Sequence, residues 1–116
     1  MTMSGEMDRA HLEKVARLFD VLAEPTRLAI LQKLKQGPHS VKELVLALEA
    51  KQANISKQLG ILLEAGLVQR ERQGGLAVYS IGESMIFELC QLVCDKLRRD
   101  AERDLKLMQK LTGGPN

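Results

Sequence analysis

Four stretches in the first half of the chain carry apolar residues at the three- and four-residue spacing of an amphipathic helix. The first stretch runs from Asp8 to Leu22, and the Asp8 side chain can cap its start. The second begins at Glu24-Pro25, since proline suits the first helical turn, and Gly37-Pro38 ends it. We therefore expect two helices before residue 39.

The third and fourth helices are expected to be short and joined by a brief polar turn. Ser40 followed by Glu43 forms a capping box that starts the third helix. After the turn at Glu49–Lys51, a fourth helix turns the apolar stripe of Ile55, Leu59, Leu62 and Leu63 inward, and Gly66 closes it. Two short helices around such a turn are typical of a helix-turn-helix, which we expect over residues 40–65.

The pattern then changes to alternation, which predicts strands over Val68–Gln73 and Leu76–Ile81. The two strands are joined by Gly74-Gly75, where both positions tolerate a positive φ, so a hairpin is expected over residues 67–81. After Gly82 a long amphipathic helix is expected over residues 83–111. The predicted fold is mainly α with a small β-hairpin, in the order ααααββα.

Length and composition favour a single domain over residues 1–116. The chain is 45% hydrophobic, too apolar for a disordered protein, and it has no apolar run of the ~20 residues that a membrane span needs. The N-terminus lacks a secretory pattern. We therefore expect a soluble, cytoplasmic protein with no membrane partner, whose two cysteines are thiols.

Polar side chains near the N-terminal end of the fourth helix are expected to lie largely on the surface that the apolar stripe leaves exposed, and they are the first candidate contacts. Asparagine and glutamine can pair with adenine, lysine with guanine, and serine with base or phosphate, while a helix N-terminus favours phosphate. Strand alternation places two arginines on one face of the hairpin, as a basic wing beside a duplex requires. Each residue taken singly fits an ordinary solvated surface, but the ordered set favours binding of double-stranded DNA. The candidates are Lys51, Gln52, Asn54, Ser56, Lys57, Gln58, Arg70 and Arg72.

These segments resemble the ArsR/SmtB-type winged-helix transcriptional repressors. The resemblance is carried by LFDVLAEPTRLAILQKL (Leu18–Leu34) and VKELVLALEAKQANISKQLGILLEAGLVQRERQGGLAVYSI (Val41–Ile81), and it covers roughly residues 12–100. It implies a winged helix-turn-helix homodimer that binds an operator palindrome and leaves it when an inducer binds. It also implies that the first and last helices, residues 8–22 and 83–111, form the dimer interface.

Three positions depart from the pattern of this family. Lys51 stands where a serine usually opens the recognition helix, Ala53 replaces the usual proline, and Gly75 replaces a common arginine at the wing tip. The family's cysteine pair at the third helix would fall at Ser40 and Lys42, and the last helix has no histidine. A zinc or nickel site typical of the family is therefore not expected. We expect His39, next to Pro38, to be solvated in a loop, and His11 to lie on the surface of the first helix without binding a metal.

Cys90 and Cys94 lie one turn apart on the last helix, within a coiled-coil-like stripe that is apolar apart from Asp104. An intrahelical disulfide would distort the helix, because Cβ atoms at this spacing are ~5–6 Å apart rather than the ~3.5–4.5 Å that a disulfide needs. A disulfide between subunits, or a thiophilic ion, fits better. We expect no required cofactor and an inducer such as trivalent arsenic or antimony, with sensing of oxidants or reactive sulfur, or simple packing, as alternatives.

An enzyme is not expected. Neither histidine has an evident partner in the sequence, and no glycine loop that could cradle a phosphate appears.

Overall fold

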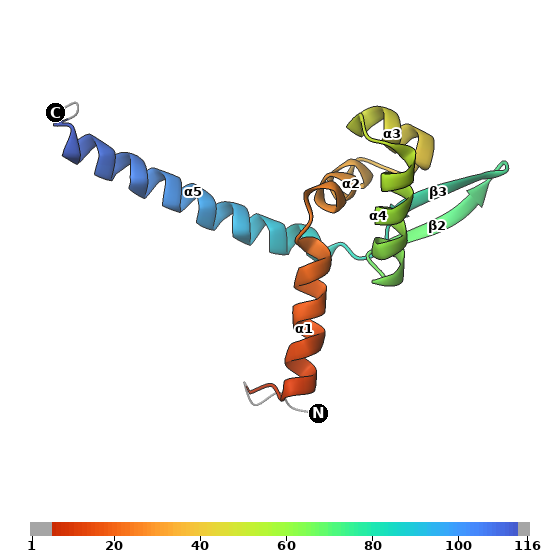
Figure 1. Cartoon of the computed structure of the whole chain (residues 1–116), viewed down its shortest axis with the longest axis horizontal. Coiled ribbons are helices and arrows are strands. Elements are labelled where there is room, and N and C mark those ends of the chain that lie inside the picture. Colours follow the sequence, from red (N-terminus) through yellow and green to blue (C-terminus); the bar gives the residue numbers. More distant parts are fainter. Residues whose placement is uncertain (1–5, 114–116) are drawn as a thin grey trace. The chain divides into compact units, whose positions relative to one another are not determined.

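The computed structural model describes residues 6–113 and divides into two compact units, one ending at Glu83 and one beginning at Ser84 (Figure 1). Five helices and three strands make up these described residues. The first unit contains α1 (Arg9–Leu22), α2 (Pro25–Lys35), β1 (His39–Ser40), α3 (Val41–Leu48), α4 (Gln52–Glu64), β2 (Val68–Gln73) and β3 (Leu76–Ile81). The second unit contains α5 (Met85–Leu111).

The helices of the first unit begin where the sequence predicts. The Asp8 carboxylate accepts a hydrogen bond from the backbone N–H of His11 at 2.9 Å and caps α1. Pro25 occupies the start of α2. At the start of α3, the Ser40 hydroxyl accepts from the Glu43 N–H at 3.2 Å, and the Glu43 carboxylate accepts from the Ser40 N–H at 2.7 Å. The predicted capping box is confirmed.

The sheet has three antiparallel strands in the order β1-β3-β2. The predicted hairpin is confirmed, with Gly74 at φ +57° and Gly75 at φ +85°, values that favour glycine. Strand β1 was not predicted, because two residues carry no readable alternation and pair only when β3 lies alongside. The expectation that His39 is solvated in a loop is wrong. It is half-buried, pairs with Tyr79, and places Nδ1 2.7 Å from the carbonyl oxygen of Gly37.

The core of the first unit lies among α2, α3, α4 and the sheet. Its fully buried side chains come from three helices, and residues at the start of β2 are also buried. They are Ile30, Leu44, Ile55, Leu59 and Leu62. Helix α1 contacts α2, and the hairpin contacts α4 through β2. This packing holds α3 and α4 as a helix-turn-helix with the hairpin next to α4.

Helix α5 is a 27-residue amphipathic helix whose apolar side chains are largely exposed, Leu97 at 60% and Leu111 at 74%. Its charged side chains form ion pairs within the helix, including Lys96 with Asp100 and Arg98 with Asp95. Across residues 6–113, no helix is both long enough and apolar enough to cross a membrane.

Candidate DNA-binding interface

Helix α4 separates its polar and apolar residues onto two faces. Ile55, Leu59 and Leu62 are fully buried, as the sequence predicts. Four of the predicted contacts on this helix are exposed, and they cluster in its first half, as expected of a recognition helix. They are Gln52, Asn54, Ser56 and Lys57. The exposed polar side chains can therefore reach a DNA groove while the buried stripe anchors the helix.

The N-terminus of α4 has a cation in place of a capping side chain. Lys51 occupies the N-cap position with extended backbone (φ −79°, ψ 142°), and its side chain makes no capping hydrogen bond. The first backbone N–H groups of a helix lack intrahelical partners and attract anions. Lys51 is exposed beside them. This end of α4 therefore combines backbone donors with a positive charge, which suits a DNA phosphate.

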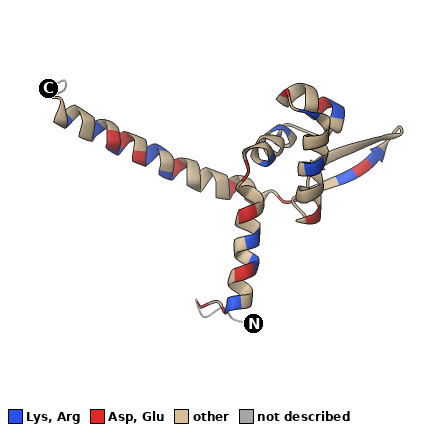
Figure 2. Cartoon of the chain, viewed as in Figure 1, with Lys and Arg blue, Asp and Glu red and all other residues tan. Residues whose placement is uncertain are grey.

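The hairpin presents two exposed arginines on the β2 strand, with Glu71 between them (Figure 2). Arg70 pairs in register with Tyr79, and Arg72 donates from Nη1 to the carbonyl oxygen of Gly75 at 3.2 Å. At the other end of β2, Val68 is buried. The buried base and the exposed arginines make the hairpin a basic projection beside α4, as predicted for a wing.

The expectation that Gln58 lies on the exposed surface of α4 is wrong. Gln58 is only 7% exposed, and it hydrogen-bonds to Arg27 of α2 at 2.7 Å and to Asn54 at 2.9 Å. The helical spacing alone places Gln58 at the border of the apolar stripe, where a side chain can be either buried or exposed to solvent. Arg27 decides the outcome, since its guanidinium supplies the partner that a buried amide needs. Arg27 was missed because it lies outside the helix-turn-helix.

The two thiols lie in the second unit. Cys90 is half-buried, Cys94 is exposed, and neither forms a disulfide. Within residues 6–113, no group of three or more His, Cys, Asp or Glu side chains could hold a metal ion. One copy of the chain therefore offers a soft ion two sulfurs one helical turn apart, and any third ligand has to come from elsewhere.

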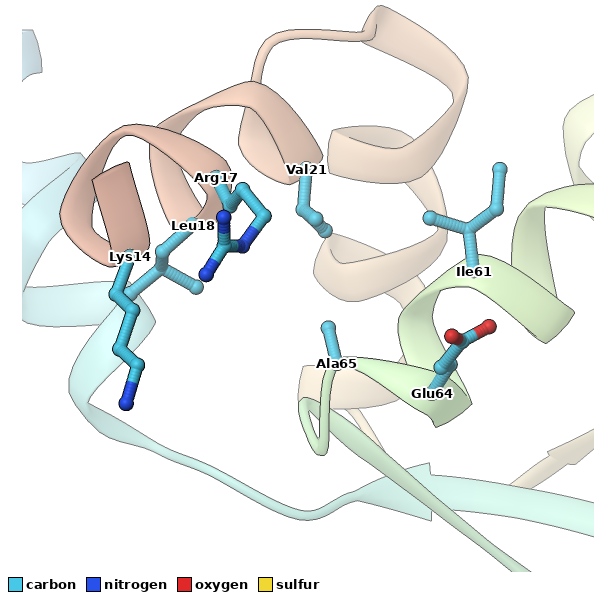
Figure 3. A pocket seen from close by; sticks show the side chains of 7 residues that line it. All are labelled: Lys14, Arg17, Leu18, Val21, Ile61, Glu64 and Ala65. Carbon is cyan, nitrogen blue, oxygen red and sulfur yellow. The ribbon is translucent and has the colours of Figure 1, made fainter. Parts of the chain in front are cut away.

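A recess of about 470 Å³ lies between α1 and the end of α4 (Figure 3). Its lining combines an apolar surface with two cations and one carboxylate. The lining residues are Lys14, Arg17, Leu18, Val21, Ile61, Glu64 and Ala65. None of the predicted DNA contacts or thiols lies in it, so the recess is a separate surface feature of the first unit.

Comparison with known proteins matches residues 24–70 to the model of the arsR family of bacterial regulatory proteins. The HTH-type transcriptional regulator NmtR of Mycobacterium tuberculosis is 36% identical over 86 residues, covering 74% of this chain and 72% of NmtR. A probable mercury resistance operon repressor of Streptomyces lividans is 33% identical over 89 residues, covering 77% of this chain and 71% of the repressor.

A solution structure from Mycobacterium bovis shows the same fold. It is described as the homodimeric winged helix-turn-helix DNA-binding domain of Mb0332, a possible ArsR-family transcriptional regulator. Its TM-score is 0.69 at 34% identity, covering 84% of this chain and 95% of that domain. The matched proteins are transcriptional regulators, so the expectation that this chain is not an enzyme is confirmed. With a basic hairpin beside a polar recognition helix, the chain belongs to the arsR family and is a winged helix-turn-helix DNA-binding transcriptional repressor.

Proposed function

We propose that this repressor works as a homodimer on palindromic operator DNA, and that a thiol-directed effector at Cys90 and Cys94 controls its binding. The observation that carries the proposal is the position of both thiols. They lie on the same long amphipathic helix whose apolar face is exposed in one copy of the chain.

The exposed apolar face of α5 supports dimerisation. A stripe with coiled-coil spacing, interrupted by the exposed Asp104, runs along the helix through Cys90, Cys94, Leu97, Ala101 and Met108. Leu97 and Met108 are 60% and 57% exposed, whereas soluble proteins rarely leave a long apolar stripe in water. Helix α1 also exposes Phe19 and Leu12. A second copy of the chain would bury these faces, as the homodimeric state of the Mb0332 domain suggests.

The chemistry of the effector follows from the ligands available. Two-fold symmetry across the α5 stripe would bring the thiols of two copies together and supply the further sulfurs that one chain lacks. Thiolates select soft ions over magnesium or calcium. Trivalent arsenic or antimony fits such a set, and the name of the S. lividans relative refers to resistance to mercury, another soft metal. A reducing cytoplasm would keep both thiols available.

The coupling to DNA follows from linkage between the two sites. Dimer geometry sets the distance between two recognition helices, which must match half-sites in successive grooves. An effector at Cys90 and Cys94 releases DNA only if it binds the DNA-free arrangement of the subunits more tightly than the DNA-bound one. The proposed effector therefore acts by changing how the two copies pack.

A second candidate effector is an oxidant or reactive sulfur species. The observation that favours it is the exposure of Cys94, because accessible thiolates are the ones that oxidise readily. Oxidation would join the two copies through a disulfide between subunits, since the spacing within one helix disfavours an internal bond. The DNA-binding parts of the proposal are the same in both cases.

The test is fluorescence anisotropy of the reduced protein on labelled DNA from its own promoter, titrated with arsenite. The matched variant is Cys90→Ser/Cys94→Ser, which removes every thiol because the chain has two cysteines. We expect arsenite to release the wild type and leave the variant bound. A parallel titration with a mild disulfide-forming oxidant separates the second candidate. Equal behaviour of both proteins in both titrations would refute thiol sensing while leaving DNA binding intact.

A further inference from the structure

A polar network crosses the otherwise apolar contact between α2 and α4. Gln58 is buried on the apolar side of α4. Ile55, three residues before it, and Leu59, the next residue, are both fully buried. A polar side chain in such a place is kept only where its hydrogen bonds are satisfied. Arg27 and Asn54 provide them, at 2.7 Å and 2.9 Å.

The direction of each hydrogen bond follows from chemistry. An arginine guanidinium can only donate, so Gln58 must turn its carbonyl oxygen Oε1 toward Arg27. The amide nitrogen Nε2 of Gln58 then points the other way and donates to Oδ1 of Asn54. Asn54 is thereby held with its oxygen toward Gln58, and its own amide nitrogen Nδ2 is the donor left for a ligand. Asn54 is exposed on the recognition helix.

The other side of Arg27 is held just as firmly. Nε donates to the carbonyl oxygen of Val21, and Nη2 donates to that of Asp20 at 3.2 Å. Both carbonyls belong to the last turn of α1. A planar guanidinium bound along several edges has one orientation, which a lysine with its single flexible ammonium group cannot reproduce. The chain of hydrogen bonds therefore starts on the backbone of α1 and ends at the exposed face of α4.

We propose that Arg27 is a positioning residue for base recognition, acting through Gln58 to fix which end of the Asn54 amide faces the DNA. The proposal rests on DNA binding by α4. With Nδ2 outward, Asn54 donates to a base atom that accepts, and guanine offers two such atoms, O6 and N7, and no donor in the major groove. With the amide reversed, Oδ1 would accept instead, and the amino groups at N6 of adenine and N4 of cytosine would be the matching partners.

The substitution Gln58→Glu tests this polarity with almost no change in size. The new carboxylate still accepts from Arg27, but it has no hydrogen to give to Asn54. Asn54 must then donate Nδ2 to the carboxylate and turn Oδ1 outward. We therefore expect a change of base preference from guanine to adenine or cytosine at one position of each half-site. A residue that merely supported the fold would weaken binding to all sequences alike.

The experiment is selection of bound sequences from a random double-stranded DNA library by the full chain. Asn54→Ala identifies the base pair that Asn54 reads, as the position where the preference falls by about tenfold. Gln58→Glu should shift that same position toward adenine or cytosine, and Arg27→Lys should weaken the guanine preference there. Gln32→Glu, the same exchange at an exposed position of α2, is the matched control and should keep the wild-type preference.

The outcomes separate the proposal from DNA binding itself. A wild type that enriches no sequence would overturn both. A wild-type consensus that Gln58→Glu and Arg27→Lys leave unchanged at the Asn54 position would overturn the positioning role alone. Circular dichroism verifies that each variant is folded, and if Gln58→Glu does not fold, an unweakened preference in Arg27→Lys overturns the proposal.

Discussion

Replacing Arg70 with glutamine should lower the salt dependence of operator binding by a definite amount. Four exposed basic side chains flank the DNA-binding surface of each copy, namely Lys51, Lys57, Arg70 and Arg72. Each phosphate that a protein neutralises contributes roughly 0.9 to the slope of log K against log salt. Eight such contacts in a dimer correspond to a slope of about −7, and a loss of affinity of roughly 10⁴-fold between 50 and 200 mM salt. Arg70→Gln removes one contact from each copy, so the slope should fall to about −5.

The assay is a series of anisotropy titrations on one labelled operator at increasing sodium chloride. The control is Arg9→Gln, the loss of an equally charged side chain that is 87% exposed on α1 and paired with Glu13. Arg9→Gln should keep the wild-type slope. If Arg70→Gln also keeps it, the hairpin does not contact phosphate and the assignment of Arg70 is wrong. If both variants reduce the slope equally, the effect reflects net charge and not a contact.

Three further changes test the fold that presents this surface. Ile55→Ala removes a fully buried side chain from α4 and should lower the free energy of unfolding by about 2–5 kcal/mol in urea titrations, and no loss would mean that α4 is not anchored there. The Ser40 N–H donates to the Glu43 carboxylate and holds its pKa below the ordinary value, so this stabilisation is complete above the ordinary glutamate pKa and is lost as the pH falls through the lower folded value. Thermal unfolding between pH 7 and pH 3 should show a smaller loss for Glu43→Gln than for the wild type, and equal losses would contradict the capping box. Gly74→Ala should cost roughly 1–2 kcal/mol because φ is +57°, whereas Gly74→Asn should be tolerated better, and equal unfolding midpoints would argue against this turn.

The local elements could be predicted because each depends on neighbours in the chain. The bounds of β2 and β3 agree with the prediction, since alternation and a Gly-Gly turn act within a few residues. The capping box at Ser40 and Glu43 is likewise a contact between residues three apart. The short β1 strand was missed because its pairing with β3 joins residues about forty positions apart, which no local pattern reports.

Among the candidate DNA contacts on α4, the exposure of most could be predicted from local spacing, whereas the burial of Gln58 depends on a distant residue. The helical period correctly separated Ile55, Leu59 and Leu62 from the exposed residues of α4, because an apolar stripe has to be buried wherever the helix packs. It could not place Gln58, which borders the stripe. A glutamine there is exposed unless another element supplies a partner, and Arg27 lies 31 residues earlier in the chain.

The sequence by itself determined the helices, the hairpin, the family and the candidate side chains for DNA contact, because all of these depend on local propensity, periodicity and residue type. The tertiary structure decided what the helical period left open, namely that Gln58 is buried and how the amides of Gln58 and Asn54 are oriented. The physical reason is that the buried amide of Gln58 needs hydrogen-bond partners from distant segments. These partners are in place only when α1, α2 and α4 pack together. Asn54 is an example. The sequence shows that an asparagine stands at this position, whereas the orientation of its amide depends on the hydrogen bonds from Arg27 to Gln58 and from Gln58 to Asn54.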